Sequence, residues 1–199
     1  MKGSAYTICF AAVLGTTCAL LLTAAAGFTK KYREDNQEAE EAVNILLALK
    51  VPLQENMSSK QVREARKDNV KEKTLGDLTT YEYKPNDKVL ATAMRFAGPG
   101  LWGPVKGFLA LEPDMKTIRG ITFYEQEETP GLGGEIATQG FRKRFVGKTI
   151  HDKDGNVGIV ICKPGSAREQ DNEIDGITGA TMTCDKVQAM LNEAIRKHY

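Results

Sequence analysis

The sequence predicts an α+β fold, in which one apolar helix precedes a domain built on a mostly antiparallel sheet with packed helices. Two patterns indicate this class. An uncharged apolar run occupies residues 5–28, and short segments of β-forming residues, separated by turn residues, begin at residue 81. The patterns divide the chain into an anchor at 1–29, a helical connecting region at 30–80 and a ligand-binding domain at 81–199.

Composition narrows the classes of function. The chain has 199 residues, of which 27% are charged, and a net charge of +1, so nothing indicates a nucleic-acid partner. None of its four cysteines forms a Cys-x-x-Cys pair, and no metal site is expected. Cys162 and Cys184 are compatible with two free thiols or with a disulfide. Neither histidine belongs to a nucleophilic triad, so we expect no catalytic residue in this chain.

The N-terminal run has the length of a membrane span. Ala5–Phe28 as a helix extends roughly 36 Å, enough to cross a bilayer core with some tilt. Thr29–Arg33 follows it without a small-residue cleavage site, which favours a retained anchor over a cleaved signal peptide. The positive charges after the run favour a cytoplasmic C-terminal side, although a large translocated domain can override so small a bias.

The connecting region is predicted to be helical. Residues 34–50 place apolar side chains on one face and acidic side chains on the other. A second helix is expected at Ser59–Asn69, after the cap signal at Ser58.

Strands and turns dominate the following part of the chain. We expect strands at Lys88–Phe96, in the second half of Leu101–Leu111, at Thr117–Tyr124 and at Gly158–Cys162, with a hairpin turn at Glu112–Lys116. Phe141 and Phe145, four residues apart, predict a helix over Ile136–Phe145. A last amphipathic helix is expected over Asp185–Lys197, with Thr183 as its N-cap.

The stretch before that last helix carries the clearest chemical signal. Asp175–Thr183 consists mainly of small residues and hydroxyls, with one carboxylate. A phosphate near Thr181 would lie at a helix N-terminus, where backbone N–H groups lack acceptors. This pattern predicts an anion site, but a polar loop that ends in an ordinary N-cap fits it equally well.

The residues Asp175-Gly-Ile-Thr178-Gly-Ala-Thr181 resemble the attachment motif of the FMN-binding domain family. Its members include flavoprotein subunits of sodium-translocating NADH:quinone oxidoreductases and of Rnf electron-transport complexes. The resemblance implies that FMN is held covalently, as a phosphoester of Thr181, and that a flavin transferase recognises Asp175. It places these further motif residues around the cofactor: Thr178, Gly179, Ala180 and Thr183.

Two further stretches resemble the same family. Glu127–Glu135 reads Glu-Glu-Thr-Pro-Gly-Leu-Gly-Gly-Glu, and Gly98–Gly103 contains the single tryptophan of the chain. Each has a simpler interpretation, a tight surface turn for the first and a packing or interfacial tryptophan for the second. The resemblance instead implies that both contact the flavin, through Leu101, Trp102, Glu128, Thr129, Gly131, Leu132 and Gly133.

Together these signals predict a membrane-anchored flavoprotein subunit of an ion-translocating redox complex, of the NADH:quinone or Rnf type. Such a subunit would carry electrons on FMN, beside sodium and ubiquinone chemistry in other subunits, and would not be catalytic alone. The resemblance implies a single-pass protein of the inner membrane with its flavin domain on the outer, periplasmic side. Two alternatives stay open: a redox-sensing or scaffold module with FMN, and a tethered domain without flavin.

One charged cluster stands apart from these motifs. Arg142, Lys143, Arg144 and Lys148 are interpreted as a solvated helix face, with a docking patch for a partner subunit or acidic head groups as the alternative.

Overall fold

The computed structural model describes residues 2–54, 56–76, 78–168 and 171–198. The chain divides into two units, residues 1–38 and residues 39–199, which are described separately. Helix α1 (Lys2–Ala48) forms the first unit and continues into the second. Within it, Ala5–Ala48 contains a stretch that is long and apolar enough to cross a membrane and is not covered by other parts of the chain.

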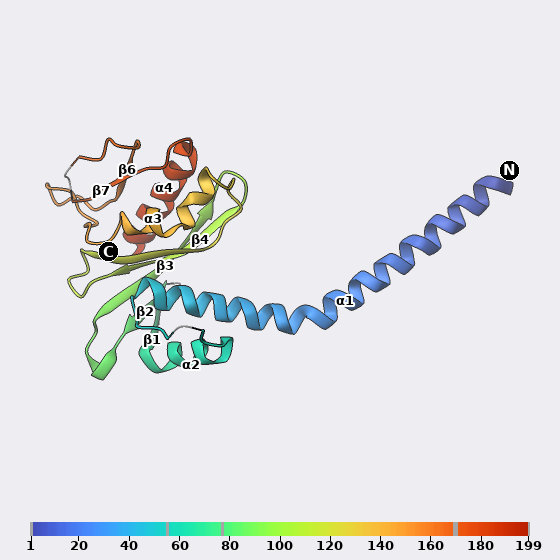
Figure 1. Cartoon of the computed structure of the whole chain (residues 1–199), viewed down its shortest axis with the longest axis horizontal. Coiled ribbons are helices and arrows are strands. Elements are labelled where there is room, and N and C mark those ends of the chain that lie inside the picture. Colours follow the sequence, from blue (N-terminus) through green and yellow to red (C-terminus); the bar gives the residue numbers. More distant parts are fainter. Residues whose placement is uncertain (1, 55, 77, 169–170, 199) are drawn as a thin grey trace. The chain divides into compact units, whose positions relative to one another are not determined.

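The second unit is built on a five-stranded antiparallel sheet (Figure 1). Its strands lie in the order in which they occur in the chain: β1 (Val70–Leu75), β2 (Leu78–Tyr83), β3 (Ala91–Pro99), β4 (Pro104–Leu111) and β5 (Ile118–Glu125). A separate parallel pair joins β6 (Val160–Cys162) to β7 (Glu173–Asp175). The predicted α+β class, with a mostly antiparallel sheet, is confirmed.

One face of the sheet is covered by the C-terminal half of the chain. Helix α4 (Thr181–His198) packs on it together with the short helices η2 (Gly133–Ala137) and α3 (Gln139–Lys143). The core between them is apolar, and Phe96 and Phe123 meet edge to face with ring centroids 5.4 Å apart.

The opposite face is covered by the end of α1 and is equally apolar. Leu46 and Phe108 are fully buried there. Because strand side chains alternate between faces, Phe108 and Leu109 of β4 belong to different cores. A Cβ on Gly120 would collide with the carbonyl oxygen of Ala48, so only glycine allows α1 to approach β5 this closely.

Helix α2 (Ser59–Asn69) begins where the sequence predicted it. The Ser58 hydroxyl accepts a hydrogen bond from the Gln61 backbone N–H, and the Gln61 side chain accepts one from the Ser58 N–H. This reciprocal pair is a capping box and fixes the start of the helix. The helical connecting region expected over 30–80 was incomplete, because β1 and the start of β2 also lie in it.

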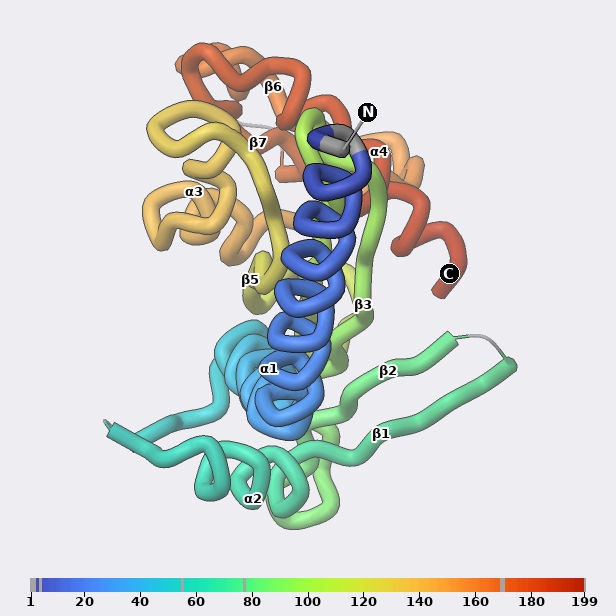
Figure 2. The backbone as a smooth tube through the Cα atoms, turned by 90° about the vertical axis from the view of Figure 1, so that its right-hand side faces the viewer, coloured from blue at the N-terminus to red at the C-terminus, as the bar shows by residue number. Residues whose placement is uncertain are grey.

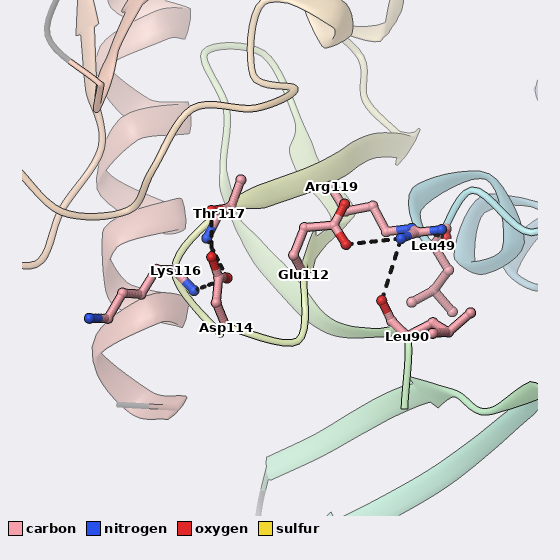
Figure 3. A network of polar contacts seen from close by, with 7 residues as sticks. All are labelled: Leu49, Leu90, Glu112, Asp114, Lys116, Thr117 and Arg119. Carbon is pink, nitrogen blue, oxygen red and sulfur yellow. Dashed lines mark hydrogen bonds and ion pairs between the residues drawn. The ribbon is translucent and has the colours of Figure 1, made fainter. Parts of the chain in front are cut away.

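The turn between β4 and β5 is fixed by Asp114, as Figure 3 shows. Its carboxylate accepts hydrogen bonds from the Lys116 N–H at 2.8 Å, the Thr117 N–H at 2.9 Å and the Thr117 hydroxyl at 2.6 Å. These donors stabilise the charged form, so they hold the pKa of Asp114 below its ordinary value. The predicted hairpin is therefore confirmed, with Asp114 as its anchor.

Arg119 of β5 ties the sheet to the end of α1 (Figure 3). Its Nε donates to the Leu49 carbonyl oxygen at 2.6 Å, and its Nη1 lies 2.9 Å from a carboxylate oxygen of Glu112. The guanidinium thus supplies a donor to a carbonyl just beyond the helix end, where no donor of the helix can reach.

Two local predictions were wrong. Helix α4 begins at Thr181, so Thr183 lies inside the first turn and is not the N-cap. The helix expected over Ile136–Phe145 is interrupted, because the Thr138 hydroxyl ends η2 by donating to Glu135 O and caps α3 by accepting from Phe141 N. The two phenylalanines that predicted the helix, Phe141 and Phe145, are both buried.

Candidate functional site

A cavity of about 390 Å³ lies beside the N-terminus of α4. This volume falls within the range of about 300–1,000 Å³ that is usual for small-molecule sites. Three stretches that are far apart in the sequence meet in it, and its walls are formed by Leu101, Trp102, Glu128, Thr129, Leu132, Gly133, Gly179, Ala180, Thr181, Met182 and Thr183. All of these except Met182 were predicted as cofactor contacts.

Thr181 opens helix α4 at the edge of this cavity, with its side chain exposed. The first N–H groups of a helix have no acceptor within the helix, and the helix dipole places partial positive charge there. Gly179, two residues earlier, has φ +75°, and a Cβ at this position would lie 2.9 Å from Leu132 Cδ2. The loop therefore requires glycine, and it presents an accessible hydroxyl at a site suited to an anion.

Glu128 joins the three stretches through its buried carboxylate. Oε1 accepts from the N–H groups of Leu101, at 2.6 Å, and Trp102, at 3.2 Å. Oε2 accepts from the Thr183 hydroxyl at 2.6 Å. Glu128 is 5% exposed and every one of these partners is a donor, so the arrangement satisfies the charged carboxylate. One side chain thus holds the Trp102 loop against the first turn of α4.

Glycine at position 133 makes this arrangement possible. A Cβ on Gly133 would lie 2.6 Å from both Glu128 Oε2 and Thr183 Oγ1, at the point where these two atoms bond. A Cβ on Gly100 would collide with the other carboxylate oxygen, Glu128 Oε1. Glycines in two of the three stretches therefore leave the space that the Glu128 carboxylate occupies.

The rim of the cavity is apolar and faces solvent. Trp102 is 70% exposed, Met182 60%, Leu132 44% and Leu101 40%. Large apolar side chains gathered at the surface are typical of a binding surface, since scattered ones need no explanation but a group does. A flat aromatic ligand could cover these side chains, whose exposed area is otherwise in contact with water.

Three predicted residues do not line the cavity. Asp175 lies at the end of β7, where its Oδ1 accepts from the Ala167 N–H at 3.1 Å. Thr178 is exposed in the loop before α4. Gly131 occupies the tip of a turn with φ +76°, in which the N–H groups of Leu132 and Gly134 both donate to Thr129 O.

Arg144 is a contributor that the sequence analysis missed. Its Nη1 donates to the carbonyl oxygens of Asp175, at 3.0 Å, and Gly176, at 2.6 Å. The guanidinium therefore holds the backbone at the start of the predicted attachment motif. The sequence had placed Arg144 on a solvated helix face, and no local pattern relates it to residues so distant in the chain.

The two domain cysteines are free thiols on the other side of Thr181. They line a separate cavity of about 270 Å³, to which Thr181 also contributes. Burial is the main cause that raises the pKa of both thiols, Cys162 and Cys184, so both are protonated and poorly nucleophilic at neutral pH. Within the described residues, no group of side chains could hold a metal ion.

Comparison with known proteins gives this region a family. Residues 100–196 match the FMN-binding domain family. This part of the chain belongs to that family. All three stretches that form the cavity lie within or at the boundary of the matched range, and so does the exposed Thr181.

The curated relatives of this FMN-binding domain are NqrC proteins, which are subunits of Na⁺-translocating NADH-quinone reductases. The protein from Vibrio alginolyticus is 35% identical over 146 residues, which cover 67% of this chain and 57% of that protein. The protein from Haemophilus ducreyi is 46% identical over 86 residues, covering 43% and 33% respectively. The chain thus spans about half the length, or less, of the curated relatives that it matches.

Solved structures of NqrC proteins share the fold. The crystal structure from Parabacteroides distasonis superposes with a TM-score of 0.72 at 27% identity, covering 83% of this chain and 92% of that one. The Shewanella oneidensis NqrC structure has a TM-score of 0.69 at 22% identity, covering 80% and 93%, and supports the fold alone.

The residues of the cavity fit the flavin that the family name implies. The glycines at 133 and 179 keep open space that a Cβ would fill, the apolar rim suits a planar ring system, and the helix start suits a phosphate.

Proposed function

We propose that the chain is a membrane-anchored flavoprotein subunit of a Na⁺-translocating NADH:quinone oxidoreductase, with FMN esterified to Thr181. One observation carries this proposal: a single cavity collects ten predicted contact residues from three separate stretches and ends at the exposed hydroxyl of Thr181. The names of the curated relatives and the family match support the same function.

Bound FMN would supply the electron-accepting and electron-donating chemistry. The chain's own residues position and shield it. The start of α4 receives the phosphate beside Thr181, while Trp102 and Leu132 keep water from one face of the ring system. Glu128 fixes the distance between these two parts of the site through its three hydrogen bonds.

The remaining parts of the proposal concern the setting. The apolar segment of α1 anchors the protein in the inner membrane as a single pass, with the flavin domain on the outer side. A flavin transferase attaches FMN during maturation and recognises Asp175, which does not line the flavin cavity. Other subunits supply the electron donor, the quinone site and the sodium path.

A matched pair of variants at Thr181 tests the attachment. The full chain is co-produced with a flavin transferase, and intact mass is measured for the wild type, Thr181→Ser and Thr181→Val. The wild type and the serine variant are expected to gain the mass of one FMN less one water, because both keep a hydroxyl. The valine variant is expected to have the unmodified mass and no flavin fluorescence after denaturing electrophoresis.

Two results would contradict the proposal. A valine variant that still carries the added mass would move the ester to another residue. A wild-type protein with unmodified mass, although a control substrate of the same transferase is loaded, would remove the covalent flavin altogether.

A further inference from the structure

Part of strand β3 has no neighbour on one side. Strand β2 pairs with β3 only between Thr80–Tyr83 and Ala91–Met94. Strand β3 continues to Pro99, paired with β4 on its other side. Figure 2 shows β2 turning away from β3 toward the tip of the β1–β2 hairpin. Among the described residues, no strand takes its place beside positions 95–99.

The pairing identifies which backbone groups face this open side. The Gly100 N–H donates to Gly103 O at 2.7 Å, so these two residues form a hydrogen-bonded pair at the end of the hairpin. In an antiparallel ladder such pairs alternate, and Gly98 and Phe96 therefore bond to β4. The N–H and C=O groups of Arg95 and Ala97, and the C=O of Pro99, consequently point away from β4.

A groove follows this open edge. One cavity, of about 330 Å³, is bounded by Leu78 and Thr79 of β2, Phe96 and Ala97 of β3, and Met190 of α4. A second, of about 590 Å³, begins at Ala97 and continues to Leu101 and Trp102. Since Leu101 and Trp102 also line the proposed flavin cavity, the groove leads from the end of α4 to the flavin site.

The two open edges of the sheet differ in chemistry. Strand β1 carries Lys71, Glu72 and Lys73, all exposed, and such charges are a usual protection against unwanted pairing. From Phe96 to Pro99 the open edge of β3 has no charged residue, and Ala97 and Pro99 are exposed. An edge of this kind is normally covered by another segment.

We infer that an extended segment of a partner subunit pairs with residues 95–99 of β3 and so brings that subunit beside the flavin. The partner is expected to place a carboxylate against Arg95 and an apolar side chain against Phe96 and Met190. In the described part of the chain, no carboxylate forms an ion pair with Arg95, whose guanidinium lies 5.8 Å from the ring centroid of Tyr124.

A second copy of this chain fits the edge less well. Its own residues at 95–99 would offer another Arg95 and no carboxylate. The identity of the partner as a subunit of the redox complex rests on the proposed function, whereas the location of the docking edge rests on the sheet alone.

Photo-crosslinking tests the location first. The full chain carries p-benzoylphenylalanine at Ala97, or at Lys73 of β1 as a control, and is irradiated in its own host membranes. Mass spectrometry then sequences the crosslinked peptides. The position-97 label is expected to capture one segment of another subunit that contains Asp or Glu, and the position-73 label is expected not to capture it.

Binding of that segment, made as a synthetic peptide, tests the pairing. Ala97→Pro removes one edge N–H and is expected to weaken binding about fivefold or more, because one backbone hydrogen bond is lost and its acceptor is left unpaired. Ala97→Ser keeps the N–H and is expected to bind within about twofold of the wild type. Arg95→Glu should weaken binding and Arg95→Lys should retain most of it, without any change to the backbone.

Several outcomes would overturn this inference. These are the absence of a position-97 crosslink, a crosslink only to a second copy of the chain, and equal binding by the proline and serine variants. If the Ala97→Pro chain does not fold, the Arg95 pair decides instead, and equal binding by its two members would reject the pairing. Flavin fluorescence separates the two proposals: a loaded wild type without a crosslink rejects only the docking edge, whereas an unloaded wild type rejects the proposed function.

Discussion

The two faces of the five-stranded sheet have the same strands and different tasks. On the α1 face, buried apolar side chains form one core from Ala42 to Ala110. On the α4 face, a second apolar core is bordered by a cavity where glycines, threonines and one buried carboxylate replace apolar packing. The comparison suggests that stability and flavin attachment depend on different residues, so substitutions on the two faces should separate the two properties.

The largest effect is expected on the α1 face. Phe108 is fully buried and contacts Tyr81 and Tyr124, with ring centroids 5.5 and 5.3 Å away. Phe108→Ala should lower the free energy of unfolding by about 3–5 kcal/mol, because it opens a cavity in this core. Urea unfolding of the full chain measures the effect, with the exposed Leu75→Ala as control. Protein that remains folded should still carry flavin, and selective loss of the flavin would break the separation.

A smaller effect on stability and a larger effect on the flavin are expected for Gly133→Ala. The new Cβ would press on Glu128 and Thr183 and disturb the bond between them. The free energy of unfolding should fall by about 1–3 kcal/mol, as for other overpacked sites, and the loaded fraction should fall with it.

Gly140→Ala is the matched control, because its nearest contact would be Thr138 Oγ1 at 3.9 Å. Intact mass gives the loaded fraction of both variants. Full loading and wild-type stability in Gly133→Ala would show that the cavity tolerates a side chain there, against the proposed cradle.

The smallest effect is expected away from both cores, at the β4–β5 turn. Because the pKa of Asp114 is lowered in the folded chain, its contribution is present above the ordinary value of 3.8 and is lost as the pH falls through the folded value. Asp114→Asn should therefore reduce stability at pH 7 by no more than about 1 kcal/mol, since the carboxylate is mostly exposed. Thermal unfolding at several pH values should show this difference shrinking below about pH 4, and a difference that grows instead would contradict the assignment.

Local patterns predicted much of this architecture. The hairpin at Glu112–Lys116 and the helix at Ser59–Asn69 depend on contacts between near neighbours, and both were found. The sequence also grouped the three stretches that meet in the cavity, although only through resemblance to a family. No periodicity relates Trp102 to Thr183, because Glu128 connects them across the fold.

The errors have physical causes as well. Strand β1 was missed because five of its six residues are exposed, so it shows no alternation of apolar and polar residues. Thr183 looked like an N-cap, but its hydroxyl bonds to Glu128 instead of to its own helix, which begins at Thr181. Arg144 was missed because its acceptors lie in a distant loop. The last two errors arose from tertiary contacts that short-range patterns do not contain.

A crystal structure of the flavin-loaded chain tests the central claim most directly. The account predicts continuous density from the Thr181 hydroxyl oxygen to the FMN phosphate, and the ring system against Trp102 and Leu132 at the apolar rim. Density attached to any other residue, or a ring system outside the cavity lined by Glu128 and Gly133, would contradict it.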